Sequence, residues 1–221
     1  LLEEQGLLGE YGHLGGQDFY ASFNLITDVL PGAREQFVPV DEDEMAVAYC
    51  NGRGIETQTL LRYDVRYSDR YEEIVFKSGD KDEWVGRRIR SGDGPRYIVH
   101  GLKPAGWPYH FNYGEWPRIV LSEGPFKAMM IAQVCGEETL SISSMGSSPP
   151  LQFWQKMAQY SDKLILVADD DYPGRKFAAE CKRRLGIRAF LPKQPFDEVS
   201  VERAAEMWRS IDTKSKKLGG F

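Results

Sequence analysis

Acidic residues follow three short apolar runs in the second half of the chain, and their types and spacing suit them to chemistry. They are Glu123, the triplet Asp169, Asp170 and Asp171, and Asp197. Gathered in one place, such carboxylates can hold Mg²⁺, which prefers hard oxygen ligands and keeps several of its waters. A carboxylate beside the metal can also act as a general acid or base.

The apolar runs predict strands that would bring these carboxylates together. The predicted strands are 119–121, 139–142, 164–168 and 188–191, and the predicted helices between and after them are 126–135, 151–160, 175–185 and 201–211. Strands that alternate with helices indicate a parallel sheet covered on both faces. Because ligands bind outside the carboxyl ends of such strands, we expect the acidic residues to converge there.

The spacing within the acidic triplet suggests separate roles. In an extended segment alternate side chains point the same way, so Asp169 and Asp171 would share a metal ion while Asp170 faces elsewhere. Glu123 would act as an acid or base or complete the metal site, and Asp197 is a further candidate ligand. Each feature alone has a structural explanation, such as a helix cap or a carboxylate at a helix N-terminus. Their common position at strand ends favours the functional interpretation.

The first half of the chain has a different pattern. Short helices are predicted at 43–53 and 56–63, and β-like runs at 73–76, 84–89 and 96–99 predict an antiparallel meander. Residues 101–117 are rich in Gly, Pro and aromatic residues and are predicted to be a linker. The expected organisation is an N-terminal subdomain over 1–116 and a second domain over 117–221.

The net charge of −5 conceals an uneven distribution. Residues 1–50 hold ten acidic residues and one basic residue, whereas the remaining 171 residues carry a net charge of +4. The acidic run Asp41–Glu44 is most simply a solvated face leading into a helix. The net positive charge of residues 51–221 is compatible with anionic partners such as nucleic acids, although the negative charge of the whole chain alone argues against them.

Composition also bounds the class of protein. A chain of 221 residues forms one large or two small domains, and no apolar run approaches the length of a membrane span. The three cysteines, Cys50, Cys135 and Cys181, are too far apart for a disulfide framework or a zinc site of the CxxC type. We therefore expect no membrane partner, no zinc in this chain and a reducing, cytoplasmic setting.

Three segments, RIVLSEGPFKAMMIA, SISSMG and LILVADDDYPGRKFAAECKRRLG, together resemble the Toprim domain. That family has an E-G pair after one strand, a Gly-containing turn after the next and D-x-D-x-x-G after a third. Asp169, Asp171 and Gly174 match the last motif, and Arg175 matches the basic residue that often follows. The resemblance covers roughly residues 118–200 and implies a Rossmann-like parallel sheet flanked by helices. The fold class is then α/β, preceded by a small basic subdomain of helices and antiparallel strands.

The upstream segments resemble one class of Toprim proteins in particular. AYCNGRGIETQTLLRYDVRY and EEIVFKSGDKDEWVGRRIRSGDGPRYIVHGL resemble consecutive segments of the DnaG-type primases of bacteria and phages. Arg90 and Arg96 match basic residues that line the template groove in that family, and Arg87, Arg88 and Lys103 join them as candidate nucleic-acid-binding residues. Without the resemblance, an ordinary charged β surface would be the preferred interpretation, because acidic residues lie among the basic ones.

The resemblance implies a DNA primase core, which joins ribonucleoside triphosphates into short RNA primers on a single-stranded DNA template. It implies Mg²⁺ or Mn²⁺ as cofactor, with Glu123, Asp169 and Asp171 as catalytic residues and metal ligands. A replicative helicase and a separate zinc-binding domain are the implied protein partners. The candidate nucleotide or phosphate contacts are Lys127, Ser144, Gly146 and Arg175.

The sequence departs from the family pattern at two places. The Phe of the V-G-F motif is Arg87, and only Asp197 remains of a late D-x-D motif. Two alternatives from other classes stay open. One is a metal-dependent Toprim nuclease with the same carboxylates, and the other is a non-catalytic module that binds single-stranded nucleic acid.

Overall fold

The computed structural model describes residues 25–26, 37–77, 84–90, 95–101 and 105–217. The predictions for residues 1–24 and for Lys103 lie outside the described residues. No helix in the described part of the chain is both long and apolar enough to cross a membrane.

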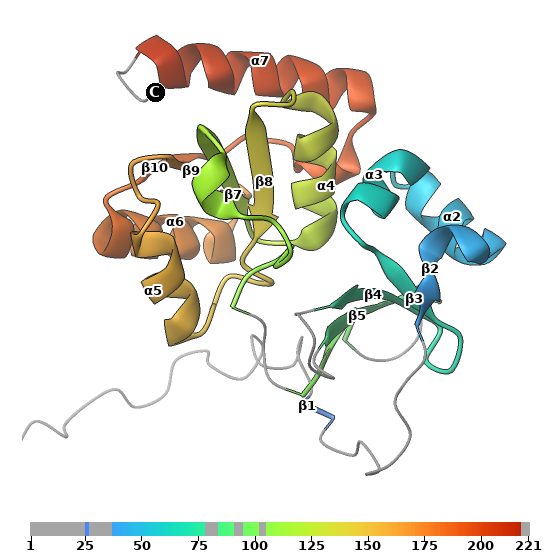
Figure 1. The fold of residues 1–221 in the computed structure, drawn as a ribbon. Helices are drawn as coiled ribbons and strands as arrows, with labels where there is room; N and C mark the ends of the chain where they lie inside the picture. The colour runs from blue at the N-terminus through green and yellow to red at the C-terminus, as the bar shows by residue number, and fades with distance from the viewer. Residues whose placement is uncertain (1–24, 27–36, 78–83, 91–94, 102–104, 218–221) are drawn as a thin grey trace, which may run out of the picture.

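The second half of the chain forms a four-stranded parallel sheet. Its strands are β7 (Arg118–Ser122), β8 (Thr139–Ser143), β9 (Leu164–Val167) and β10 (Arg188–Phe190), in the order β10-β9-β7-β8. Helices α4 (Pro125–Val134) and α7 (Val201–Lys217) pack on one face, and α5 (Leu151–Ala158) and α6 (Tyr172–Leu185) on the other (Figure 1). The predicted α/β class with a parallel sheet flanked by helices is confirmed.

The strands of this sheet read as apolar runs because both faces are covered. In β7, Val120 belongs to the apolar cluster on the side of α4 and α7. Ile119 and Leu121 belong to the cluster on the side of α5 and α6. All three side chains are fully buried. Such two-sided burial leaves the strand ends as the places where polar side chains can stand.

The first half of the chain forms a six-stranded sheet. Its strands are β1 (Leu25–Ile26), β2 (Val38–Pro39), β3 (Arg66–Ser68), β4 (Glu73–Lys77), β5 (Trp84–Arg88) and β6 (Tyr97–His100), in the order β1-β6-β5-β4-β3-β2. All neighbours are antiparallel except β1 and β6. Helices α2 (Glu44–Asn51) and α3 (Thr57–Arg62) precede β3. The predicted meander is therefore present, within a larger sheet whose short strands β1, β2 and β3 the sequence pattern did not indicate.

One apolar core joins the two sheets. Phe76 of β4 and Phe126 of α4 lie in the same buried cluster, with ring centroids 5.6 Å apart. The buried hydroxyl of Tyr63 donates to the carbonyl of Ser141 in β8 at 2.9 Å. These contacts fix the position of the antiparallel sheet relative to the carboxyl ends of the parallel strands.

Residues 105–117 of the segment predicted to be a linker are instead packed into the structure. Trp107 is buried, and its backbone exchanges two hydrogen bonds with that of Ser143 at the end of β8. Tyr113 is also buried, and its hydroxyl donates to the carbonyl of Pro108. The linker prediction was wrong because the aromatic residues Trp107 and Tyr113 are buried in the apolar cores and anchor the segment.

Candidate active site

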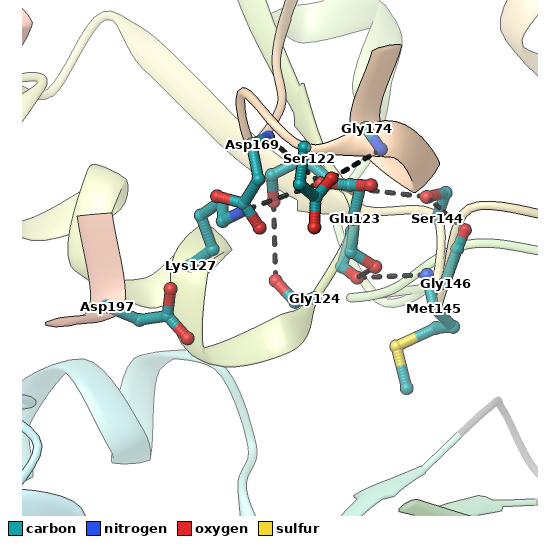
Figure 2. A network of polar contacts seen from close by, with 12 residues as sticks. Ser122, Glu123, Gly124, Lys127, Ser144, Met145, Gly146, Asp169, Gly174 and Asp197 are labelled. Atoms are coloured by element: carbon teal, nitrogen blue, oxygen red, sulfur yellow. Dashed lines mark hydrogen bonds and ion pairs between the residues drawn. The ribbon is translucent and has the colours of Figure 1, made fainter. Parts of the chain in front are cut away.

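The acidic centre forms where β7 and β9 end side by side. Glu123 follows β7 directly, and Gly124 is the N-cap of α4. Asp169 lies two residues beyond β9, and its backbone N–H donates to Glu123 Oε2 at 3.1 Å. The parallel pairing of β7 with β9 therefore brings these two carboxylates together, as the sequence predicted (Figure 2).

Lys127 lies between these carboxylates. It stands four residues after Glu123 in the first turn of α4, and its side chain is only 4% exposed. Its Nζ lies 3.3 Å from Glu123 Oε2 and 2.5 Å from Asp169 Oδ2. The ammonium thus forms ion pairs with both carboxylates. Asp197 lies on the same side of the acidic centre as Lys127 (Figure 2).

Burial and charge shift the titration of this group of residues. Burial raises the pKa of the Glu123 carboxyl, and the nearby Lys127 charge only partly opposes that effect. Burial alone would lower the pKa of the Lys127 ammonium, but the charges of Asp169 and Glu123 outweigh it and raise that pKa. Lys127 therefore stays protonated at neutral pH.

The other two aspartates of the triplet have separate partners. Asp171 is the N-cap of α6, and its Oδ1 accepts the N–H of Gly174 at 2.8 Å. Asp170 pairs with Arg175 at 2.8 Å, outside the acidic centre. Within the described ranges, no three Asp, Glu, His or Cys side chains converge as a metal-binding group. A metal ion shared by Asp169 and Asp171 stays a prediction.

A glycine is required where the triplet turns into α6. A Cβ on Gly174 would lie 2.1 Å from the carbonyl oxygen of Asp169, which is a rigid backbone atom. The close approach of the helix to the strand end therefore depends on this residue, in agreement with its place in the D-x-D-x-x-G motif.

A cleft of about 300 Å³ lies in front of the acidic centre, between the two sheets. One wall carries Glu123, Lys127, Asp169 and Asp197, and the opposite wall carries Arg53, Arg87 and Arg96. The cleft thus sets carboxylates against guanidinium groups. That arrangement suits a ligand that carries phosphates and a divalent cation.

The predicted nucleic-acid-binding residues differ in their availability. Arg96 is exposed and lines the cleft. Arg87 lines it too but is buried, with its Nε donating to the Tyr49 hydroxyl at 3.0 Å. Arg90 pairs with Glu72 at 3.1 Å, and Arg88 ends β5 without lining the cleft.

The predicted phosphate contacts divide in the same way. Lys127 and Gly146 line the cleft, and the N–H of Gly146 donates to the Glu123 carbonyl at 2.6 Å. The Ser144 hydroxyl is buried behind the cleft, within hydrogen-bond distance of the Ser122 and Gly146 carbonyls. Arg175 is occupied by Asp170. Their contact with phosphate stays a prediction for all four residues.

Sequence reasoning did not assign a role to Arg53. Its Nη2 lies 3.4 Å from Asp197 Oδ2, and its guanidinium lies over the Phe126 ring at 4.8 Å from the centroid. The signal was present in the segment CNGRGIET, where Gly52 and Gly54 flank an arginine at the end of a helix.

Comparison with known proteins finds one domain family that matches the second half of the chain. Residues 118–197 match the Toprim domain. A comparison with curated protein sequences finds no significant match. The described site lies within the matched segment, apart from the arginines on the opposite wall.

Solved structures of primases share the fold. The Aquifex aeolicus primase, comprising zinc-binding and RNA polymerase domains, matches with a TM-score of 0.60 and 16% identity over 80% of this chain and 57% of that one. The E. coli primase catalytic core matches with a TM-score of 0.58 and 15% identity, over 80% and 75% of the two chains. The primase fragment of the bacteriophage T7 primase-helicase protein gives 0.54 and 18%, over 72% of both.

The chain spans 57% of the length of the Aquifex primase chain, so it corresponds to a part of that protein. Identities of 15–18% to these three structures establish the fold and not the activity. Residues 118–197 match the Toprim domain, and the chain shares the fold of the DnaG-type primase catalytic cores.

Proposed function

We propose that this chain is a primase-like nucleotidyltransferase that joins ribonucleoside triphosphates on a single-stranded DNA template. The observation that carries the proposal is the cleft, where Toprim carboxylates stand opposite Arg53, Arg87 and Arg96. In this proposal the N-terminal subdomain, residues 1–116, binds the template, and the domain over residues 117–221 carries out nucleotidyl transfer.

The donor set suits the divalent cation that Toprim chemistry requires. Glu123 and Asp169 supply hard oxygen ligands, and the buried Oδ1 of Asp169 has no hydrogen-bond partner among the described residues. Mg²⁺ needs only one or two carboxylates when phosphate oxygens and waters complete its shell. Glu123 and Asp169 would therefore hold Mg²⁺ or Mn²⁺, with Asp171 or Asp197 as further ligands. When bound, the cation supplies neutralisation of charge on the transferring phosphoryl group.

The chain's own residues would orient the reactants. Arg96, exposed at the cleft, would bind the template backbone, and Arg53 and Arg87 would set a positive wall opposite the carboxylates. Glu123, whose carboxylate lines the cleft, would also take the proton of the attacking hydroxyl. Ordering both nucleotides on the template would supply much of the rate.

A primer-synthesis assay tests the proposal. The chain is incubated with single-stranded DNA, labelled ribonucleoside triphosphates and Mg²⁺ or Mn²⁺, with Glu123→Gln as the site variant and Lys176→Met, an exposed change on α6, as the matched control. We expect short RNAs from the unmodified chain and the control, and none from Glu123→Gln. Shortened DNA would identify a nuclease instead, and DNA binding without either product would identify a binding module.

Protein partners follow from the same proposal. The Aquifex structure joins a zinc-binding domain to the polymerase domain, and the T7 fragment comes from a primase-helicase protein. We propose that a zinc-binding domain and a replicative helicase act with this core. Adding a separate zinc-binding domain should raise initiation more than extension of a pre-annealed RNA, because initiation must order two free nucleotides.

A further inference from the structure

Lys127 occupies a position where a lysine is unfavourable on its own. It lies in the first turn of α4, where the positive end of the helix dipole opposes a cation. Its side chain is 4% exposed, so the ammonium has also lost most of its contact with water. Something specific to this site must compensate both costs.

The compensation comes from the two carboxylates of the acidic centre. The ammonium forms ion pairs with Glu123 Oε2 and Asp169 Oδ2, which belong to carboxylates that follow the neighbouring strands β7 and β9. Glu123 Oε2 is held in place by the N–H of Asp169 as well. The ammonium thus takes the position between the carboxylates that a divalent cation would also take.

The ammonium leaves this site only partly satisfied. Asp169 Oδ1 is buried and has no partner within the described structure, although Oδ2 of the same carboxylate binds Lys127. An unpaired buried carboxylate oxygen is costly, and a metal ion with several coordination positions would engage it. The single charge of the ammonium therefore leaves at least one carboxylate oxygen, Asp169 Oδ1, available as a metal ligand.

We propose that Lys127 is the resident cation of the acidic centre and that the divalent metal must displace its ammonium from Glu123 and Asp169 to bind. This inference rests on the proposed metal-dependent function. Lys127 acts as a positioning residue that sets metal affinity. Lys127, Glu123 and Asp169 together carry one net negative charge. Without the Lys127 ammonium, the two carboxylates carry two.

Metal binding to a charge variant tests the proposal directly. Lys127→Met keeps a long apolar side chain and removes the ammonium, and Lys176→Met removes the same charge from an exposed position on α6. Mn²⁺ affinity is measured by calorimetry on the full chain without nucleotide or DNA. We expect Lys127→Met to bind Mn²⁺ about tenfold more tightly or better, because a cation some 3 Å from both ligands has gone. Lys176→Met should bind as the unmodified chain does.

Thermal unfolding gives a second readout. Without metal, Lys127→Met should unfold at a lower temperature, since two neighbouring carboxylates are left without a cation. Mn²⁺ should raise its unfolding temperature more than it raises that of the unmodified chain. Equal or weaker Mn²⁺ binding by a folded Lys127→Met, or no binding by either protein, would overturn the proposal.

If Lys127→Met does not fold, an experiment on the unmodified chain can still test whether the metal displaces the ammonium. The reaction of Lys127 with an amine-acetylating reagent is followed by peptide mass spectrometry, with and without Mn²⁺. Displacement predicts faster acetylation with the metal, and an unchanged or slower rate would refute it. None of these measurements uses primer synthesis. Tighter Mn²⁺ binding by a chain that makes no RNA would keep this inference and refute the proposed activity.

Discussion

Arg53 and Asp197 join the two walls of the cleft through an ion pair of 3.4 Å. Arg53 follows α2 beside the antiparallel sheet, and Asp197 stands in the turn that precedes α7. Both side chains are about one-quarter exposed or less, at 24% and 20%. Because the Arg53 guanidinium also lies on the Phe126 ring, this pair links both walls to the start of α4.

A double-mutant cycle should detect this link. Arg53→Ala and Asp197→Asn are compared singly and together by chemical denaturation, and we expect a coupling free energy of about 1 kcal/mol for this half-buried pair. Arg203→Ala, which removes an exposed arginine paired with Glu206 on α7, should change stability much less. Strictly additive effects of the two site variants would mean that the pair does not hold the walls together.

Asp169→Asn should abolish primer synthesis, with a loss of about 100-fold or more, because one charged oxygen of the proposed metal site is removed. It should also lower the unfolding free energy by about 1–2 kcal/mol, because Lys127 loses its shorter ion pair while it stays buried. Circular dichroism checks that the fold is retained. Normal RNA synthesis by the folded variant would remove Asp169 from the mechanism.

The role of Lys127 marks where sequence reasoning reached its limit. The strand ends that carry Glu123 and Asp169 were predictable, since apolar runs and turn residues locate the ends of buried strands. The stabilising effect of the Asp169 carboxylate could not be predicted in this way. From the sequence alone, three adjacent carboxylates are expected to repel each other and to destabilise the fold. The cation that reverses this expectation comes from α4, and its direction depends on how that helix packs.

The antiparallel sheet shows the same limit. Its longer strands alternate with clear turn residues and were predicted, but the two-residue and three-residue strands β2 and β3 give too little pattern to detect. The cleft itself depends on long-range packing of Phe76 against Phe126, which no local pattern reports. Arg53 was missed for that reason, because its partner Asp197 lies 144 residues away in the chain.

Arg96 and Arg90 should contribute unequally to DNA binding. Arg96 is exposed at the cleft, whereas Arg90 is already paired with Glu72. For Arg96→Ala, the slope of log affinity against log salt should become shallower by about 0.7 for each phosphate group of a single strand that the arginine neutralises. Arg90→Ala should change it less. Fluorescence anisotropy with single-stranded DNA at several salt concentrations measures both slopes, and equal slopes would reject the ranking.

Asp212 should stabilise the docking of α7 in a pH-dependent manner. Partial burial acts to raise the pKa of Asp212, but hydrogen bonds from Lys216 and Arg118 outweigh it and hold that pKa below its usual range. A lowered folded-state pKa contributes stability above the unfolded value of about 3.9, and the contribution is lost as pH falls through the folded pKa.

Asp212→Asn should therefore be less stable than the unmodified chain at pH 7, by about 1 kcal/mol for this partly buried carboxylate. The difference should persist at pH 5 and shrink as the pH falls below about 3.9, as measured by urea denaturation at each pH. Asp162→Asn, an exposed change before β9, serves as the control. A difference that stays constant down to pH 3 would exclude the ion pairs as its cause.

Two glycines at the site should respond very unequally to the same added methyl group. In Gly174→Ala the new Cβ would meet the Asp169 carbonyl at 2.1 Å, so α6 or the end of β9 must move. We expect a loss of about 1–3 kcal/mol of stability and weaker Mn²⁺ binding, since the displaced backbone carries the metal-site carboxylate. In Gly124→Ala the Cβ meets nothing within 4 Å and φ is −114°, so stability should fall by no more than the modest preference for glycine over alanine at an N-cap. Denaturation and Mn²⁺ calorimetry on both variants separate steric support of the carboxylate from a general effect of losing glycine. Equal losses in the two variants would show that the contact between Gly174 and the Asp169 backbone does not position the site.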